Sequence, residues 1–251
     1  MAESQTPKGA QSALRAVRLL KLFTMDRPHL HLAQISGMAG LNKTTAHRLL
    51  QALLSEEMLE RDVQSGAYRL GPAVVALGLQ AVSSGNLRLN ARPLLKSLAE
   101  ETGETATLEV AVEDTMLILD EMSGGHRVAA GGNVGTRWAM HATSTGKAII
   151  AFSDNGLERL GERLMPLTAQ TITEHGQLEL QLDEIRRRGF AETVDELEYG
   201  FTGVGAVIRG RTGEILGAMS ICGPTQRLPE NRRATLGAML CAATAQLQPG
   251  Y

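Results

Sequence analysis

The segment His141–Ala148 comes nearest to a catalytic motif in this sequence. Its Gly146-Lys147 pair is similar to the end of a phosphate-binding loop, GxxxxGK[ST], in which glycine backbone cradles phosphates and a hydroxyl binds magnesium. Here His141 stands at the first glycine position and Ala148 at the hydroxyl position, so two of the four fixed positions are missing. Nucleotide hydrolysis at this segment is therefore not expected, and His141 more simply orders a loop or lines a pocket.

Other enzyme signatures are also absent from the sequence. No GxSxG elbow surrounds a serine, and Ser144 close to His141 on one local segment does not make a catalytic triad. No HExxH occurs, and the six histidines and two cysteines have no metal-ligand spacing. The glycines of residues 131–135 do not form GxGxxG between a strand and a helix. We therefore expect no enzymatic activity, no metal and no cofactor; the enzyme alternative rests on His141 alone.

Charge is distributed unevenly along the chain, although the 25 Lys+Arg and 27 Asp+Glu give a formal net charge of only −2. Residues 1–85 contain nine basic and six acidic residues, whereas residues 86–251 contain sixteen and twenty-one. Residues 8–48 alone contain seven basic residues and one acidic residue. A basic front end on an acidic body indicates an anionic partner for the front end only. A merely solvated surface gives the same counts, so the residue pattern must decide between the two.

Side chains able to contact nucleic acid cluster at the start of a predicted helix, residues 43–54. Its apolar residues follow the spacing i, i+3, i+4, i+7, i+8, which predicts one buried face. The other face gathers long polar side chains in its first turns: Lys43, Thr44, His47, Arg48 and Gln51. A recognition helix uses its N-terminal residues on base edges in the major groove. Lys43 and Arg48 can neutralise phosphates, and Arg48 can instead fork onto guanine.

Two preceding helices would position this segment. The first, residues 12–25, has a predicted apolar stripe made of Leu14, Val17, Leu20 and the flanking Ala13, Ala16 and Phe23. The second spans residues 32–39 and is followed by Gly40, which can take the left-handed conformation that ends a helix. Asn42 then suits the N-cap of the third helix. The order of helix, short turn and helix favours DNA recognition over an ordinary surface helix.

A hairpin follows the three helices. Residues 58–63 and 67–70 predict two short strands around Gln64 to Gly66, where Gly66 suits a left-handed loop position. The expected DNA-binding residues are Arg15, Arg18, Asn42, Lys43, Thr44, Thr45, His47, Arg48, Arg61 and Arg69. Residues 10–71 are therefore predicted to form a winged helix-turn-helix domain. The alternative is a sensory or protein-interaction module whose winged helix does not bind DNA.

The rear of the chain changes from helical to strand periodicity. Helices are expected at residues 73–82, 87–101, 144–152, 178–188 and 230–247. Strands are expected at residues 105–112, 115–122, 127–130, 201–208 and 214–222. Strands joined by hairpins and interrupted by helices predict an α+β fold with an antiparallel sheet. We divide the chain into the front domain, a linker helix at residues 72–86 and a rear domain at residues 87–251.

Motifs in both halves resemble the IclR family of bacterial transcription regulators. They lie at residues 16–20, 40–50, 68–71, 140–148, 188–191, 196–200 and 220–224, so the resemblance covers about residues 13–247. This sequence departs from the family pattern at Asn42, where the family usually has Pro, at Val207, where it often has Pro, and at Ser144, where it often has Ala. The resemblance implies a GAF-like rear domain that binds a small organic acid or aromatic catabolite and that forms dimers or tetramers.

The resemblance also implies an effector pocket. The family positions correspond to Leu108, Met116, Leu119, Ala129, Trp138, Met140, His141, Ala142, Thr143, Ser144, Glu196, Gly203, Met219 and Ser220. Backbone amides of residues 143–146 would bind an effector carboxylate at the start of the predicted helix 144–152. We expect an effector-responsive regulator of a catabolic operon, a repressor rather than an activator, that binds operator DNA as a homo-oligomer.

The sequence also carries expectations about location. No apolar run approaches the ~18 residues that span a bilayer, and residues 1–11 lack the apolar core of a signal peptide. Cys222 and Cys241 lie 19 positions apart, with no metal-like spacing. We therefore expect a cytoplasmic protein with reduced thiols and no membrane partner.

Overall fold

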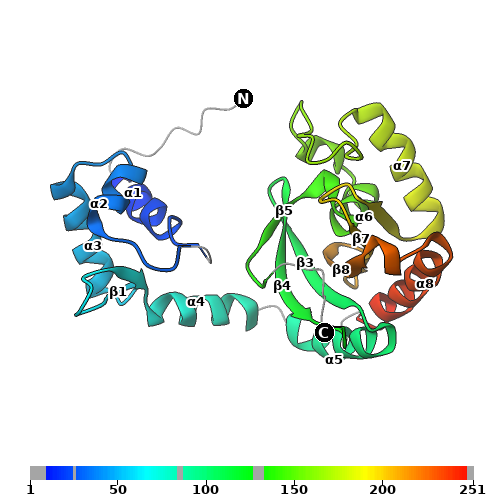
Figure 1. Cartoon of the computed structure of the whole chain (residues 1–251), viewed down its shortest axis with the longest axis horizontal. Helices are drawn as coiled ribbons and strands as arrows, with labels where there is room; N and C mark the ends of the chain where they lie inside the picture. Colours follow the sequence, from blue (N-terminus) through cyan, green and yellow to red (C-terminus); the bar gives the residue numbers. More distant parts are fainter. Residues whose placement is uncertain (1–9, 25–26, 84–86, 127–132, 248–251) are drawn as a thin grey trace. The chain divides into compact units, whose positions relative to one another are not determined.

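A computed structural model describes residues 10–24, 27–83, 87–126 and 133–247. The chain divides into two compact units, residues 1–84 and 85–251, and Figure 1 colours them from blue to cyan and from green to red. The front unit contains α1 (Gln11–Leu20), α2 (Leu32–Met38), α3 (Lys43–Ser55), β1 (Leu59–Arg61), β2 (Tyr68–Leu70) and α4 (Pro72–Ser83). The three-helix order with a following hairpin is the architecture predicted from the sequence.

A small apolar core holds the front unit together. Leu19, Ile35 and Leu50 are fully buried, one from each of the first three helices, and Tyr68 of the hairpin joins them. Leu30 pairs with Tyr68 through two backbone hydrogen bonds, so the segment before α2 is tied to the hairpin. Because all three helices bury one face in this core, the opposite face of α3 is left for solvent.

The predicted stripe of α1 is wrong in part. The helix ends at Leu20 rather than Met25, and Leu14 and Val17 are 39% and 49% exposed. Leu19 and Phe23 are the buried residues, with Ala16 and Leu20 partly buried beside them. Apolar residues occupy two overlapping stripes of helical spacing in this segment, so periodicity alone could not choose the one that packs.

The rear unit is built on a six-stranded antiparallel sheet of order β5-β4-β3-β8-β7-β6. Its strands are β3 (Thr105–Val112), β4 (Thr115–Met122), β5 (Arg137–Ala139), β6 (Ala191–Val194), β7 (Phe201–Arg209) and β8 (Ile215–Pro224). Its helices are α5 (Leu87–Thr102), α6 (Ser144–Phe152), α7 (His175–Arg188), α8 (Glu230–Gln246) and the short 3-10 helices η1 (Met140–Ala142), η2 (Leu157–Arg159) and η3 (Thr225–Arg227). The short edge strands β5 and β6 were not predicted from the sequence. The strand predicted at residues 127–130 lies outside the described residues.

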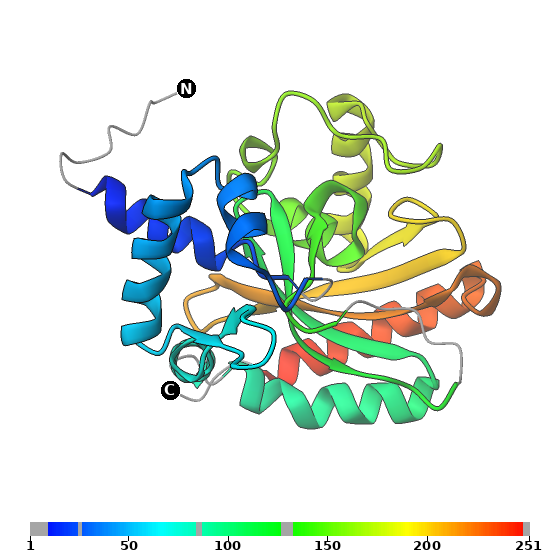
Figure 2. The same ribbon diagram turned by 60° about the vertical axis from the view of Figure 1, so that its left-hand side comes forward.

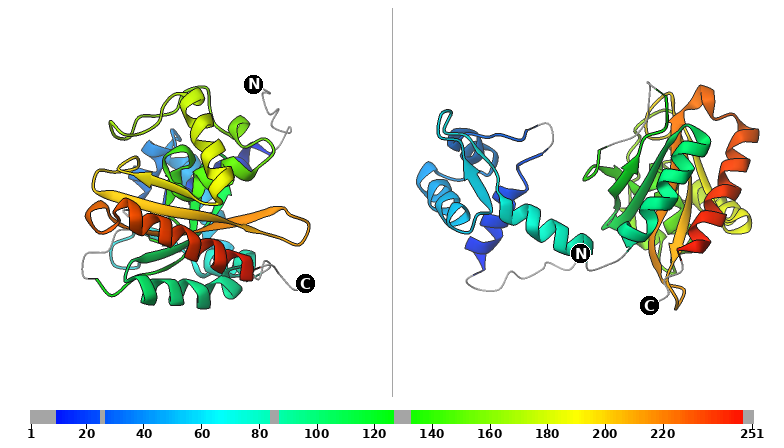
Figure 3. Two further views of the ribbon diagram at one scale, coloured as in Figure 1. Left: turned by 90° about the vertical axis from the view of Figure 1, so that its right-hand side faces the viewer. Right: turned by 90° about the horizontal axis from the view of Figure 1, so that it is seen from below.

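Helices cover both faces of the sheet, as Figures 2 and 3 show. One core lies between the sheet and the helices α5 and α8, and includes Leu95, Leu108, Met219 and Leu240. A second core lies on the other face beneath α6 and α7. We call the first face the α5/α8 face and the second the α6 face. The alternation of side chains along each strand therefore decides which core, or which site, a residue joins.

A register shift between β3 and β4 changes this alternation. Leu108 pairs with Asp120 and Glu109 pairs with Ile118, so Leu119 is an extra residue in β4. Such a bulge re-aims the side chains beyond it. Ile118 consequently shares the α6 face with Glu109, whereas Asp120 faces α5 and pairs with Arg88 and Arg92.

Two glycines allow α6 to lie close to the sheet. A Cβ atom at Gly205 of β7 would come within 2.8 Å of the Ser144 carbonyl carbon and the Thr145 nitrogen. A Cβ atom at Gly146 would come within 2.0 Å of the Met140 carbonyl oxygen. Any side chain at either position would push the first turn of α6 away, because the atoms it meets belong to the backbone.

None of the helices in the described parts of the chain is long and apolar enough to cross a membrane. Within those same parts, His, Cys, Asp and Glu side chains form no group of three or more that could hold a metal ion.

Candidate functional site

The first turns of α3 present polar side chains to solvent. Lys43, Thr44, His47 and Arg48 are exposed, whereas Ala46 and Leu50 on the other face are fully buried. Among the residues that the structure describes, Lys43 and Arg48 form no ion pair with an Asp or Glu. Their charges therefore remain available to an external anion.

The helix begins where the sequence predicts. Asn42 is the N-cap, and its side-chain oxygen accepts a hydrogen bond of 2.8 Å from the Thr45 backbone N–H. Gly40 has a φ of +61°, the left-handed conformation expected at the end of α2. The cap and the glycine fix the turn between the two helices, so the N-terminus of α3 is held at a defined angle to α2.

The other predicted DNA-binding residues have mixed surroundings. Arg18 is exposed, whereas Arg15 and Thr45 are half-buried. In the hairpin, Arg69 lies 2.6 Å from Glu60 on the paired strand, so its charge is already matched. Arg61 donates to the Gly66 carbonyl oxygen at 3.3 Å and lies over the Tyr68 ring. Arg61 is thus held at the tip of the wing, with Gly66 at a φ of +70° as predicted for the turn.

A polar cavity lies on the α6 face of the rear sheet. It is lined by Thr107, Glu109, Ile118, Trp138, Thr143, Ser144, Thr145, Leu197, Phe201, Gly203, Ser220 and Cys222. The volume open to the centre of a water molecule is about 20 Å³, which is room for about one water. A larger guest must therefore displace lining side chains. Trp138 and Phe201 are the bulkiest of these, and both are only partly buried.

Five of the predicted effector residues meet in this cavity: Trp138, Thr143, Ser144, Gly203 and Ser220. They come from β5, the start of α6, β7 and β8. Thr143 caps α6 by accepting a hydrogen bond of 3.2 Å from the Gly146 N–H. One of the amides expected to bind a carboxylate is therefore already used by the chain itself.

Other predicted pocket residues lie elsewhere. Leu108, Leu119 and Met219 pack in the core on the α5/α8 face. Side chains alternate along a strand, and each of these residues is next to one whose side chain points to the α6 face. Met116 and Met140 lie in the core beneath α6 and α7. Ala142 is fully buried in η1, and Ala129 lies outside the described residues. None of the described residues in this group lines the cavity.

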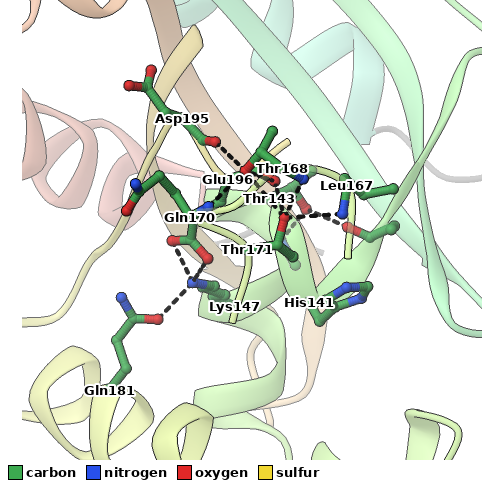
Figure 4. A network of polar contacts seen from close by, with 12 residues as sticks. His141, Thr143, Lys147, Leu167, Thr168, Gln170, Thr171, Gln181, Asp195 and Glu196 are labelled. Atoms are coloured by element: carbon green, nitrogen blue, oxygen red, sulfur yellow. Dashed lines mark hydrogen bonds and ion pairs between the residues drawn. The ribbon is translucent and has the colours of Figure 1, made fainter. Parts of the chain in front are cut away.

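His141 and Glu196 belong to a polar network shown in Figure 4. A ring nitrogen of His141 lies 3.0 Å from the Met165 carbonyl oxygen. Glu196 forms a buried ion pair with Lys147 of α6, with both carboxylate oxygens 2.6 Å from Nζ. Lys147 also donates to Gln181 at 2.6 Å. The lysine of the P-loop-like segment is therefore bound within the fold rather than presented to a phosphate.

Sequence reasoning missed Glu109, the acidic residue among those that line the cavity. Its side chain is 5% exposed. Thr107 Oγ1 donates to one carboxylate oxygen and Thr145 Oγ1 to the other, each at 2.7 Å. Burial raises the pKa of Glu109 above its usual range, although the two hydroxyl hydrogen bonds act to lower it. The sequence did contain a signal for this residue. Glu109 is the one acid in the strand 105–112, and it shares a strand face with Thr105 and Thr107, whereas the other residues of the strand are small or apolar.

Replacing Glu109 with Gln should stabilise the chain at neutral pH and not at acidic pH. Folding raises the pKa of the Glu109 carboxyl. Its contribution to the free energy of unfolding is therefore complete at pH values below the unfolded pKa, and it is lost as the pH rises through the folded pKa. The wild type should lose up to about 1.4 kcal/mol per pH unit relative to Glu109→Gln over this window, which begins near the ordinary glutamate pKa and extends upward. Urea unfolding of both proteins from acidic to neutral pH measures it. A difference between them that does not change with pH would contradict a titrating, buried Glu109.

Comparison with known proteins identifies the family. The sequence model for the C-terminal part of the bacterial transcriptional regulator IclR matches residues 79–248, and that for the IclR helix-turn-helix domain matches residues 12–63. The chain belongs to the IclR family of bacterial transcriptional regulators. Together the two matches span residues 12–63 and 79–248, most of the chain, and they confirm the resemblance found in the motifs.

The curated relatives of this IclR-family chain are named as regulators, and each match covers nearly the whole length of the relative. The transcriptional regulator BhcR of Paracoccus denitrificans is 31% identical over 96% of this chain and 88% of its own length. The glycerol operon regulatory protein of Streptomyces griseus is 32% identical over 91% of each chain. The transcriptional repressor IclR of Escherichia coli is 28% identical over 96% of this chain and 90% of its own.

Solved structures of the family share the fold. An IclR homolog from Microbacterium hydrocarbonoxydans, complexed with 4-hydroxybenzoate, has a TM-score of 0.83 and 27% identity, and the match covers 93% of this chain and 96% of that one. The IclR regulator from Alicyclobacillus acidocaldarius also has a TM-score of 0.83, at 26% identity, with 94% and 96% covered. The α+β fold of a helix-turn-helix domain and an antiparallel-sheet domain is therefore that of an IclR-family regulator.

Proposed function

We propose that this regulator binds operator DNA by laying the first turns of α3 in the major groove. The observation that supports this most strongly is the exposure of Lys43, Thr44, His47 and Arg48 on a helix whose other face is packed in the core. The wing residue Arg61 would reach the sugar–phosphate backbone beside the groove. Arg69 contributes less, because Glu60 already matches its charge.

We also propose that the operator is bound by a homodimer or a larger homo-oligomer. Leu14 and Val17 of α1, and Val75 and Leu77 of α4, are apolar side chains left exposed in the front unit. Burial against a second copy would remove these apolar side chains from water, which stabilises the association of the two copies. Two copies would place their α3 helices in successive major grooves, about 34 Å or a multiple of it apart.

The proposed effector site is the cavity on the α6 face of the rear sheet. An effector changes DNA affinity only if it binds one arrangement of the protein more tightly than another, typically by about 1–3 kcal/mol. Repression of a catabolic operon is the role proposed here. It is supported by the relatives named as a glycerol operon regulator and as a repressor.

A selection from fragmented genomic DNA tests DNA binding directly. The purified chain should retain a small set of fragments that share an inverted repeat. It should bind them at least about 10³-fold more tightly than random fragments of equal length. DNase footprinting then measures the half-site spacing. Equal retention of all fragments, or no retention at low salt, would contradict the proposal and favour a winged helix that contacts protein instead.

A further inference from the structure

The cavity on the α6 face contains a carboxyl group with no cation beside it. Glu109 lines the cavity and is 5% exposed. Within the part of the chain that the structure describes, no Lys, Arg or His side chain forms an ion pair with it. Its two oxygens accept hydrogen bonds from neutral hydroxyl groups, those of Thr107 and Thr145, each at 2.7 Å. A buried carboxylate without an opposite charge is costly, so this group holds a proton more readily than an exposed glutamate does.

Glu109 can bind a guest and keep both of these hydrogen bonds. A carboxyl group has about four hydrogen-bonding positions on its two oxygens, and the two threonine hydroxyls occupy one on each oxygen. When the group is protonated, one of the remaining positions carries an O–H that can donate to a guest. When it is ionised, every position can only accept. The protonation state of Glu109 therefore decides whether the cavity suits a guest that accepts a hydrogen bond.

Other donors border the cavity at the start of α6. The first N–H groups of a helix have no partner within it, and those of Ser144 and Thr145 donate to no other described residue. The Ser144 side chain is 4% exposed, and its hydroxyl forms no hydrogen bond with another described residue. Backbone N–H groups at a helix N-terminus favour an anion. With Glu109 lining the same space, a carboxylate is well accommodated only if the glutamate carries a proton.

The cavity is too small for a carboxylate to enter it without meeting Glu109. The volume open to the centre of a water molecule is about 20 Å³, which is room for about one water. A larger guest gains space by displacing Trp138 and Phe201, which are only partly buried, while its polar end lies among the polar lining residues. Two carboxylates in contact do not both stay ionised, because their like charges repel, and such a pair holds one proton between them.

We propose that Glu109 is a specificity-determining residue, which recognises the effector as a carboxylic acid by sharing one proton with the effector carboxylate. The proton comes from solvent when an ionised effector enters a cavity in which Glu109 is ionised. Glu109 stays bonded to the two threonine hydroxyls, and the effector also accepts from the donors at the start of α6. This assignment rests on the cavity being the effector site proposed above. Effector affinity is then greatest where Glu109 is already protonated, and it falls as the pH rises.

Three further titratable side chains face Glu109 from the described elements packed against its face of β3: Glu121 of β4, Cys222 of β8 and Lys147 of α6. Burial raises the pKa of Glu121, and the charge of Glu109 raises it further. Burial and the charge of Glu109 also raise the pKa of the Cys222 thiol, so the thiol stays protonated. Lys147 is held in its ion pair with Glu196. Glu121 is therefore the group that an experiment must separate from Glu109.

Acids and amides of equal size test the proposal. The probes are benzoate with benzamide and butyrate with butyramide. Both acids stay ionised from about pH 6 to 9, since the ordinary pKa of a carboxyl group lies well below this range. Trp138 is the only tryptophan of the chain and lines the cavity, so its fluorescence reports binding at this site. Titration calorimetry in two buffers of different ionisation enthalpy counts the protons taken up.

At least one acid should bind most tightly at the acidic end of this range. Its affinity should then fall by up to about tenfold for each further pH unit, with uptake of up to about one proton, whereas the amides should show no such change. Glu109→Gln keeps an N–H donor and cannot titrate, so it should bind the acid with an affinity that no longer depends on pH. Glu109→Leu has no donor and should bind at least about tenfold less tightly than Glu109→Gln.

Two variants serve as controls because each removes one acid that does not line the cavity. Glu121→Gln removes the neighbouring acid of β4, and Glu179→Gln removes an exposed acid of α7. Both should keep the fall in acid affinity with rising pH. Operator affinity is measured on the same samples without any probe, so that a failure of DNA binding is distinguished from a failure of acid recognition.

Three results would overturn the proposal. An acid affinity that stays constant across the range, without proton uptake, would show that Glu109 shares no proton with the guest. A pH dependence that persists in Glu109→Gln, or that disappears in Glu121→Gln, would assign the proton to another group. Failure of both acids to bind would show that the cavity does not recognise a carboxylate.

Discussion

Replacing both Lys43 and Arg48 with Ala should weaken operator binding roughly 30- to 1,000-fold, because each side chain is expected to contribute about 1–2 kcal/mol through phosphate or guanine contacts. Both residues are exposed, and no acid among the described residues pairs with either of them. The packing of α3 depends on other residues, chiefly Ala46, Leu50 and Leu53 on its buried face. The loss should therefore appear in binding while the fold persists.

The salt dependence of binding gives the sharper measurement. Each lost phosphate contact should reduce the slope of log K against log salt by roughly 0.9. Fluorescence anisotropy with a labelled operator at several salt concentrations yields both the affinity and the slope. The matched control replaces Lys96 and Arg187, two exposed cations of the rear unit, with Ala and should leave both unchanged. If the α3 variant keeps its affinity and slope, α3 is not the recognition helix.

Breaking the ion pair between Lys147 and Glu196 should have the largest effect on stability. Lys147 is fully buried and Glu196 nearly so, and their charged atoms lie 2.6 Å apart. Burial lowers the pKa of Lys147, and the adjacent Glu196 acts to raise it, with a net lowering. Glu196→Leu leaves the lysine buried with only Gln181 as a polar partner. Removal of one member of a buried pair typically costs about 3–5 kcal/mol.

The double variant Lys147→Met with Glu196→Leu provides the internal comparison. It removes both charges and replaces them with apolar side chains, so it should be more stable than Glu196→Leu alone. Urea unfolding of the three proteins measures the coupling between the two residues. The exposed pair Asp183–Arg186 of α7 is the control, and Asp183→Asn should cost less than about 1 kcal/mol. A small loss in Glu196→Leu would show that the pair does not hold α6.

This pair also affects the proposed effector cavity. Lys147 belongs to α6, whose first residues line the cavity, and Glu196 precedes Leu197, another lining residue. The Glu196 carbonyl oxygen accepts from Thr171 Oγ1 at 2.7 Å, and the Asp195 carbonyl oxygen accepts from Thr168 Oγ1 at 2.6 Å. Figure 4 shows these bonds converging on one segment. A broken pair should therefore loosen both walls of the cavity at once.

Local signals in the sequence predicted most elements of both units. The rear helices lie within three residues of their predicted bounds, and the strands at residues 105–112 and 115–122 match. Asn42, Gly40 and Gly66 act where they were expected, because caps and tight turns depend on residues only a few positions apart. The exposed face of α3 was equally predictable, since helical spacing alone separates Arg48 from Leu50.

The tertiary structure alone decided which strand residues meet in the cavity. Met219 and Ser220 are adjacent, yet one packs under α5 and α8 and the other lines the cavity. The extra residue in β4 puts Asp120 on one face and brings Glu121 opposite Thr107 on the other. Pairing across strands joins residues more than 100 positions apart, as in the contact of Thr107 with Ser220. Register, bulges and buried charge pairs arise only when distant segments pack, so a single sequence predicted the exposed polar face of α3 but not the acid that lines the cavity.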